Sequence, residues 1–507
     1  MVKTKAHDGT EVAFDDAKPP MAGGMKDVYF APDRSYVVAF FRDKVDVSTR
    51  ERLDLIVGRY RDGIFNQSGG DYWRELFCWP TKTLEYRGKL GLVAPTYPKH
   101  FFFEHGSVNN DFLGIKGKDK EGKWFANPSH RFHLLDERER GNWQMFLRVC
   151  INISRAVRRM HAAGLAHSDL SYKNVLIDPQ GGRACVIDID GLVVPGKFPP
   201  GVAGTPDFIA PEVIKTSRLA MTDRSKCLPR RETDLHALAV LIYYYLLNRH
   251  PLKGRKVHDL DDTARDEELA MGERALFVED MKDRSNRYDM RWLRANYPPE
   301  KINQVLPYSD LDQLPCSMLG RYLTPLVIKA FGEGLHNPAA RPTADDWETA
   351  LVKTWDLLQP CVNPQCRQKW YPFNNTTKPV CPFCGTPFRG QLPVLNLYSK
   401  RPGGAFGPDG DVLMVYHNQY LCSWHASRKI FPNEKLTAEQ KKRVGYFSFH
   451  NGQWLLVNEA LPTMFDVTGG KKEPVAIRSS VALTENRQIL LSEEDGGRLV
   501  QVQLVSA

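Results

Sequence analysis

Short hydrophobic runs separated by polar turns mark the first hundred residues. Four runs rich in β-branched and aromatic residues predict strands, at residues 28–30, 36–41, 77–86 and 90–94. Between residues 53 and 60, apolar side chains recur at intervals of three and four, which favours one amphipathic helix. The pattern therefore predicts a strand-rich region with one helix over residues 15–100.

From residue 101 to 358 the apolar spacing becomes helical. Residues 143–160 predict one long helix, and residues 343–355 predict another. The longest apolar run, 235–247, is too short to span a bilayer and fits a buried helix. Short β-rich runs return between residues 411 and 505, and their spacing predicts a small β-sandwich. The chain is thus expected to be an α+β protein.

Composition adds few constraints. A chain of 507 residues with 42% hydrophobic and 25% charged residues is ordinary for a globular protein of several domains. The net charge of +9 is spread without long blocks, so nucleic-acid binding is not supported. The N-terminal residues lack the apolar run of a signal peptide, and we expect a cytoplasmic protein without a membrane partner.

The residues with the clearest chemistry are Asp169, Asn174 and Asp188. Asp169 can accept a proton from an attacking hydroxyl, and Asn174 and Asp188 can hold Mg²⁺ (or Mn²⁺) against phosphates. The two carboxylates are 19 residues apart, which suits a catalytic loop, a short strand pair and a metal-binding turn. This spacing predicts phosphoryl transfer from ATP.

The motif resembles the active site of the eukaryotic-type protein kinases. Residues 204–212, Gly-Thr-Pro-Asp-Phe-Ile-Ala-Pro-Glu, are similar to the end of the activation segment in that family. The resemblance implies a bilobal fold, with the strand-rich region (15–100) as N-lobe and the helical region (101–358) as C-lobe. It also implies that Asp234 anchors the catalytic loop and that Arg341 pairs with Glu212.

The phosphate-binding lysine of the family is missing from its usual strand, where Phe41 stands instead. The segment Gly23-Gly24-Met25-Lys26 is similar to the glycine-rich loop of the with-no-lysine kinases, which implies that Lys26 contacts the α and β phosphates. The alternative is an exposed loop lysine. Neither Glu51 nor Asp54 fits the register of the helix glutamate that pairs with the family's lysine.

Other positions follow from the same resemblance. Lys173 is expected to contact the γ-phosphate, because Ser171 occupies the usual lysine position. Ser168 replaces the arginine that receives an activation-loop phosphate, so activity should need no such phosphate. Asp190 is either a second metal contact or a turn residue. The remaining nucleotide-binding positions implied are Gly23, Gly24, Val28, Ala39, Thr96, Tyr97 and Leu176.

Four of the ten cysteines crowd into 24 residues: Cys361, Cys366, Cys381 and Cys384. Their spacing is typical of a zinc ribbon, here residues 359–390, and four thiolates close a tetrahedral site with no open position. Zn²⁺ should therefore be structural and supply most of the stability of this short segment. A redox pair is the alternative.

Residues 391–507 are expected to form the β-sandwich-like domain, which faintly resembles forkhead-associated phosphopeptide-binding domains. A protein or phosphopeptide partner is expected there. Together, these features resemble an atypical bacterial serine/threonine kinase that transfers the γ-phosphate of ATP to a protein hydroxyl. The alternatives are a nucleotide-binding pseudokinase scaffold and a small-molecule phosphotransferase.

Overall fold

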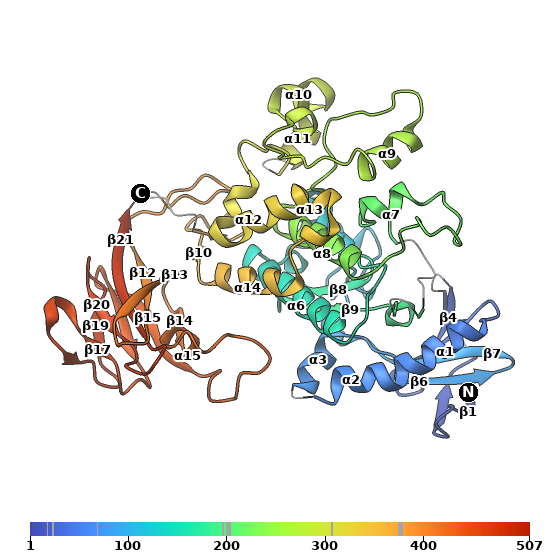
Figure 1. Cartoon of the computed structure of the whole chain (residues 1–507), viewed down its shortest axis with the longest axis horizontal. Helices are drawn as coiled ribbons and strands as arrows, with labels where there is room; N and C mark the ends of the chain where they lie inside the picture. The colour runs from blue at the N-terminus through green and yellow to red at the C-terminus, as the bar shows by residue number, and fades with distance from the viewer. Residues whose placement is uncertain are drawn as a thin grey trace. The chain divides into compact units, whose positions relative to one another are not determined.

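The computed structural model describes residues 1–17, 19–22, 25–67, 69–194, 197–198, 204–305, 308–373 and 379–506. The chain forms two compact units, which Figure 1 shows in sequence colours. The first unit comprises Met1–Gly141, Met145–Cys316 and Pro325–Glu348. The second comprises Asn142–Gln144, Ser317–Thr324 and the chain from Thr349 onward.

The first unit begins with an antiparallel sheet of five strands in the order β3-β4-β5-β7-β6. An additional hairpin of β1 and β2, which the sequence pattern did not predict, packs on this sheet. Its Phe14 shares a buried cluster with Val38, Phe40 and Leu84. The strands are β1 (Val2–Lys5), β2 (Glu11–Phe14), β3 (Met21–Ala22), β4 (Lys26–Phe30), β5 (Tyr36–Phe41), β6 (Lys82–Tyr86) and β7 (Lys89–Pro95).

The helix predicted around residues 53–60 is present but interrupted. Asp46 caps helix α1 (Val47–Leu55) by accepting the N–H of Thr49 at 2.6 Å. A π-helical turn, Ile56–Tyr60, follows, and Gly58 within it leaves helical geometry at φ −100° and ψ −105°. The segment continues as α2 (Arg61–Phe65) and α3 (Gly70–Leu76).

The centre of the first unit is helical. Most of α8 is buried, as its apolar run predicted, and α6 and α14 lie where helical spacing predicted helices. The helices are α4 (Val108–Asp111), α5 (Lys123–Ala126), α6 (Trp143–Ala162), α7 (Pro211–Lys215), α8 (Arg231–Leu247), α9 (Thr263–Met271), α10 (Met290–Asn296), α11 (Pro299–Val305), α12 (Gly320–Phe331), α13 (Glu333–His336) and α14 (Ala344–Trp355). A hairpin of β8 (Val175–Asp178) and β9 (Arg183–Val186) completes the unit.

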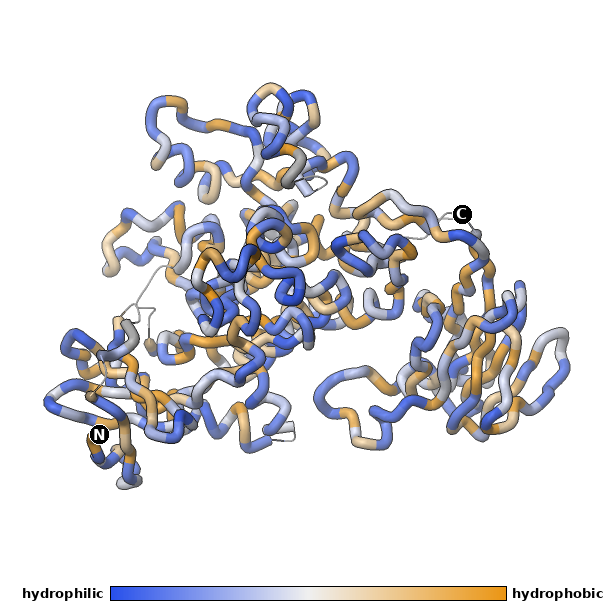
Figure 2. Tube along the Cα trace, turned by 180° about the vertical axis from the view of Figure 1, so that it is seen from behind, coloured by the Kyte–Doolittle hydropathy of each residue, from blue (hydrophilic) through white to orange (hydrophobic). Residues whose placement is uncertain are grey.

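Two β-structures make up most of the second unit. Strands β10 (Leu358–Pro360) and β11 (Trp370–Pro372) pair antiparallel beside the cysteine cluster. A six-stranded sheet in the order β13-β12-β21-β20-β17-β18 and a four-stranded sheet, β14-β15-β16-β19, then share one apolar core. The strands of this region carry much of the hydrophobic colour in Figure 2. The sheet-rich C-terminal region is therefore confirmed.

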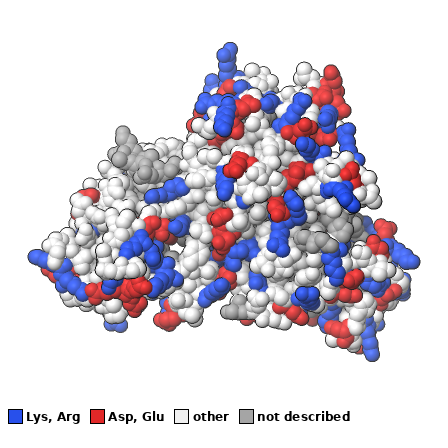
Figure 3. Space-filling model, viewed as in Figure 1, with Lys and Arg blue, Asp and Glu red and all other residues white. Residues whose placement is uncertain are grey.

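The sandwich strands are β12 (Gln391–Lys400), β13 (Phe406–Met414), β14 (Tyr420–Cys422), β15 (Arg443–His450), β16 (Gln453–Asn458), β17 (Phe465–Asp466), β18 (Glu473–Pro474), β19 (Ser480–Ala482), β20 (Gln488–Leu490) and β21 (Arg498–Ser506), with the short helix α15 (Ser423–Ala426). Across the described part of the chain, no helix combines the length and the hydropathy needed to cross a bilayer. Acidic and basic side chains are interspersed over the face shown in Figure 3.

Candidate active site

The loop that carries Asp169 is fixed to helix α8 by one buried carboxylate. Asp234 is 2% exposed, and its two carboxylate oxygens accept the backbone N–H groups of His167 at 2.7 Å and Ser168 at 3.1 Å. Ser168 has a positive φ of 68°, a conformation that non-glycine residues rarely adopt without such support. The loop conformation is therefore held by a side chain 65 residues further along the chain.

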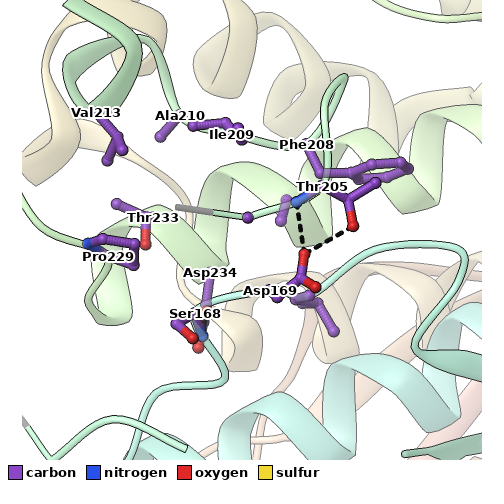
Figure 4. A pocket seen from close by; sticks show the side chains of 13 residues that line it. Ser168, Asp169, Thr205, Phe208, Ile209, Ala210, Val213, Pro229, Thr233 and Asp234 are labelled. Carbon is purple, nitrogen blue, oxygen red and sulfur yellow. Dashed lines mark hydrogen bonds between the residues drawn. The ribbon is translucent and has the colours of Figure 1, made fainter. Parts of the chain in front are cut away.

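Both carboxylate oxygens of Asp169 have hydrogen-bond donors, as Figure 4 shows for one of them. Oδ1 accepts the backbone N–H of Thr205 at 2.5 Å and its hydroxyl at 2.8 Å. Oδ2 accepts the side-chain amide of Asn174 at 2.9 Å, and the same amide donates to the Asp169 carbonyl oxygen at 2.8 Å. These contacts orient the Asp169 carboxylate and join it to Asn174.

The turn that carries Asp188 is bonded to the same loop. The Ile187 N–H donates to the carbonyl oxygen of Asn174 at 3.0 Å, and a ring nitrogen of His167 lies 2.9 Å from the Ile187 carbonyl oxygen. Asp188 itself has left-handed backbone angles, φ 60° and ψ 41°. The amide oxygen of Asn174 and the carboxylate of Asp188 are oxygen donors of the kind that Mg²⁺ prefers, so the residues present fit this ion.

Lys26 lies on β4 directly opposite Phe41 on β5. Its ammonium nitrogen lies 5.2 Å from the centre of the Phe41 ring, and its side chain is only 14% exposed. This burial argues against the alternative of an exposed loop lysine. Gly23 and Gly24, predicted to contact phosphate, lie outside the described residues.

The ammonium of Lys26 forms ion pairs with two carboxylates of the turn that follows β9. It pairs with Asp190 and lies 3.7 Å from an oxygen of Asp188. Burial by itself lowers the pKa of Lys26, but the charges of Asp190 and Asp188 outweigh burial and raise it. Lys26 is therefore a protonated cation at the turn that carries Asp188 and Asp190.

Sequence reasoning did not identify the partner of Lys26. The sequence is compatible with Asp190 as either a metal contact or a turn residue; in the structure it lies in the turn Ile189–Gly191 and pairs with Lys26. Its spacing of two residues from Asp188 was the available signal. Of the two helix acids considered, Glu51 pairs with Lys197 at 3.0 Å and Asp54 accepts the Thr83 hydroxyl at 3.1 Å.

The predicted adenine-site residues come from the five-stranded sheet, from the chain that follows β7 and from β8. Val28 and Ala39 are paired on β4 and β5. Leu176 lies in a buried cluster against which Tyr97 packs, and burial raises the pKa of Tyr97 well above its ordinary value. The buried Thr96 hydroxyl has no hydrogen-bond partner within the described residues. An unsatisfied buried hydroxyl beside apolar residues suits a heterocyclic ligand.

Lys173 lies on the catalytic loop with an exposed side chain, four residues after Asp169. Its backbone N–H donates to the Ser171 hydroxyl at 3.3 Å. The Lys173 side chain is therefore accessible from solvent.

Arg341 and Glu212 form a bidentate ion pair, with both nitrogen–oxygen distances at 2.8 Å. The arginine side chain is 1% exposed and also donates to three backbone carbonyl oxygens, those of Glu232, Gly334 and Leu335. This pair connects α7, at the end of the 204–212 segment, to the segment that follows α13. It has no direct part in chemistry.

In the second unit, the four predicted zinc ligands come together. Their sulfur atoms all lie within 4.8 Å of one another, with Cys361 and Cys384 at 3.5 Å and Cys366 and Cys381 at 3.8 Å. Tetrahedral Zn²⁺ with bonds of about 2.3 Å requires sulfur separations of about 3.8 Å. Two hairpin-like turns present the ligands, with the Cys361 N–H bonded to Lys369 and the Cys381 N–H bonded to Thr386. The cluster fits a structural zinc ion.

Comparison with known proteins agrees with this geometry. Residues 126–306 match the family model of the protein kinase domain. The serine/threonine-protein kinase PkaB of Streptomyces coelicolor is 28% identical over 135 residues, 24% of this chain and 29% of that protein. PknD of Chlamydia felis is 28% identical over 152 residues, 25% of this chain and 15% of that protein. The matches thus span less than a third of these relatives.

Proposed function

The chain carries a protein kinase domain of the eukaryotic-type superfamily, and from this premise we propose that it is a serine/threonine kinase that uses Mg-ATP (or Mn-ATP). Asp169 accepts the proton of the attacking protein hydroxyl, and its fixed orientation supports that role. Asn174 and Asp188 hold the metal, which, when bound, neutralises charge on the phosphates.

The observation that carries this proposal is the position of Lys26. A kinase without a cation at the phosphates would lose transition-state stabilisation, and Phe41 cannot provide it. The ammonium of Lys26, 3.7 Å from Asp188, is a cation beside the proposed metal ligand. Lys26 therefore contacts the α and β phosphates, and Lys173 on the exposed loop contacts the γ-phosphate. Thr96, Tyr97, Val28, Ala39 and Leu176 surround the adenine.

A protein acceptor is favoured over a small molecule by the ordered segment 204–212. The Glu212–Arg341 pair fixes its end, and Thr205 within it contacts Asp169 directly. A segment held in this way can support a polypeptide beside the Asp169 carboxylate. We further propose that the sandwich at 391–507 binds a protein or phosphopeptide partner, and that Zn²⁺ stabilises the ribbon at 359–390.

The test measures transfer of labelled γ-phosphate from ATP to a generic acceptor protein and to the chain itself, followed by identification of the phosphorylated residue type. Asp169→Asn and Lys26→Met should each reduce kcat by at least 100-fold, in line with loss of a general base or a preorganised cation. Lys44→Met, at an exposed position two residues before the cap of α1, is the matched control and should retain activity. Wild-type transfer no faster than Asp169→Asn would favour the pseudokinase scaffold.

A further inference from the structure

The metal-binding turn carries a carboxylate that faces the phosphate-binding lysine. We propose that Asp190 is a positioning residue that holds the Lys26 ammonium in place for phosphate contact, an inference that rests on the proposed kinase function. The side chains of Lys26 and Asp190 are 14% and 15% exposed. Because little solvent reaches them, their attraction is weakly screened and restricts where the ammonium can lie.

The helix beside the sheet does not serve this purpose. Glu51 of α1 pairs with Lys197, and both side chains are more than half exposed. Asp54 accepts a hydrogen bond from Thr83 on β6. Both acids are therefore engaged elsewhere, and the position of Lys26 does not depend on a carboxylate of α1.

The two carboxylates of the turn have different surroundings. Asp188 is 52% exposed and lies 3.7 Å from the ammonium, whereas Asp190 is mostly buried and forms the closer ion pair. The left-handed backbone at Asp188 and the 3₁₀ turn Ile189–Gly191 produce this difference. Asp188 thus remains accessible to a metal ion, while Asp190 contacts the lysine.

This arrangement joins two parts of the site through one short segment. The proposed metal ligand and the lysine anchor are two residues apart, so a movement of the turn displaces both together. Displacement of a catalytic group by about 1 Å can reduce a rate about 100-fold. Removing the charge of Asp190 should therefore reduce kcat. The affinity for the metal should stay unchanged, because the proposed ligands Asn174 and Asp188 are still present.

The first experiment uses nucleotide-free, full-length protein and does not depend on catalysis. A double-mutant cycle compares the urea unfolding midpoints of Lys26→Met, Asp190→Asn and the double variant. Lys26→Met leaves the Asp190 carboxylate without its cation, and Asp190→Asn leaves Lys26 with the more distant Asp188 carboxylate, so each should lower the midpoint. The double variant should lose less than the sum of the two. Strictly additive losses would show that the two side chains are not coupled and would overturn the inference.

The second experiment measures kcat, KM for ATP and the Mg²⁺ concentration that gives half-maximal rate. Asp190→Asn should lower kcat about 10- to 100-fold with the Mg²⁺ midpoint unchanged within about threefold, and Glu51→Gln should match the wild type. A Mg²⁺ midpoint raised tenfold or more would make Asp190 a metal ligand instead, and an unchanged kcat would exclude positioning. If the wild type transfers no phosphate, the function proposal fails and the stability cycle alone decides whether Asp190 anchors Lys26.

Discussion

Substitution of Arg341 by methionine tests how the 204–212 segment is held. The change removes both bonds to Glu212 and the donors to three backbone carbonyl oxygens, while keeping a long apolar side chain in a site that is 1% exposed. Glu212, whose side chain is 20% exposed, then keeps a charge without its partner. Breaking a buried pair in this way costs about 3–5 kcal/mol.

The assay is hydrogen–deuterium exchange of peptides that cover α7 and α13, because local opening there depends on this pair. A loss of about 3 kcal/mol corresponds to exchange accelerated about 150-fold, since each 1.36 kcal/mol is a factor of ten. Arg74→Met is the matched control, because Arg74 pairs with Asp71, whose side chain is fully exposed to solvent. Exchange in this variant should stay within about threefold of the wild type. The double variant with Glu212→Gln should recover part of the loss. Acceleration below about fivefold in Arg341→Met would refute the reasoning.

Two further predictions concern the other contacts. Full-length protein should contain one zinc per chain by elemental analysis. Cys366→Ser should abolish that zinc and expose residues 358–373 to proteolysis, whereas Cys422→Ser, at a buried cysteine outside the cluster, should keep it. A full zinc content in Cys366→Ser would contradict the assigned ligand set. Thr205→Val removes the hydroxyl bond to Asp169 but keeps the backbone bond, so kcat should fall about tenfold with KM for ATP unchanged. A raised KM with an unchanged kcat would indicate a binding defect instead.

The sequence predicted those parts of the fold that depend on local pattern. The strand pair around Lys26 and Phe41 followed from β-rich runs joined by a short turn, and α8 followed from its apolar run. The hairpin β1–β2 was missed because its apolar positions are few, and its stability comes from Phe14 packing on distant strands. The break at Gly58 was also unforeseen, since a helical stripe does not report where the backbone departs from helical angles.

The candidate site shows the same division. Motif spacing singled out Asp169, Asn174, Asp188 and the cysteine cluster as candidates, because the residues of each motif lie within short segments of the chain. The partner of Lys26 could not be predicted, since Asp190 follows a residue with a positive φ, Asp188, and motif spacing does not report that backbone conformation. A side chain whose direction depends on an uncommon backbone conformation is beyond the reach of pattern arguments.

The phenylalanine at position 41, where the kinase family has its lysine, and the carboxylate of Asp190 are two parts of one arrangement. Lys26 extends from β4, whereas the lysine of the family stands on β5, at the position of Phe41 here. A helix acid placed to pair with a lysine on β5 is therefore not placed to pair with one on β4. The charges of Asp169, Asp188 and Asp190 act on one another, and Lys26 offsets only one of the three. At the proposed nucleotide site these three carboxylates outnumber the two lysines, Lys26 and Lys173, so a polyphosphate is repelled until a divalent cation enters. We expect nucleotide affinity to depend on metal more steeply here than in a site whose lysine is anchored away from the metal ligands.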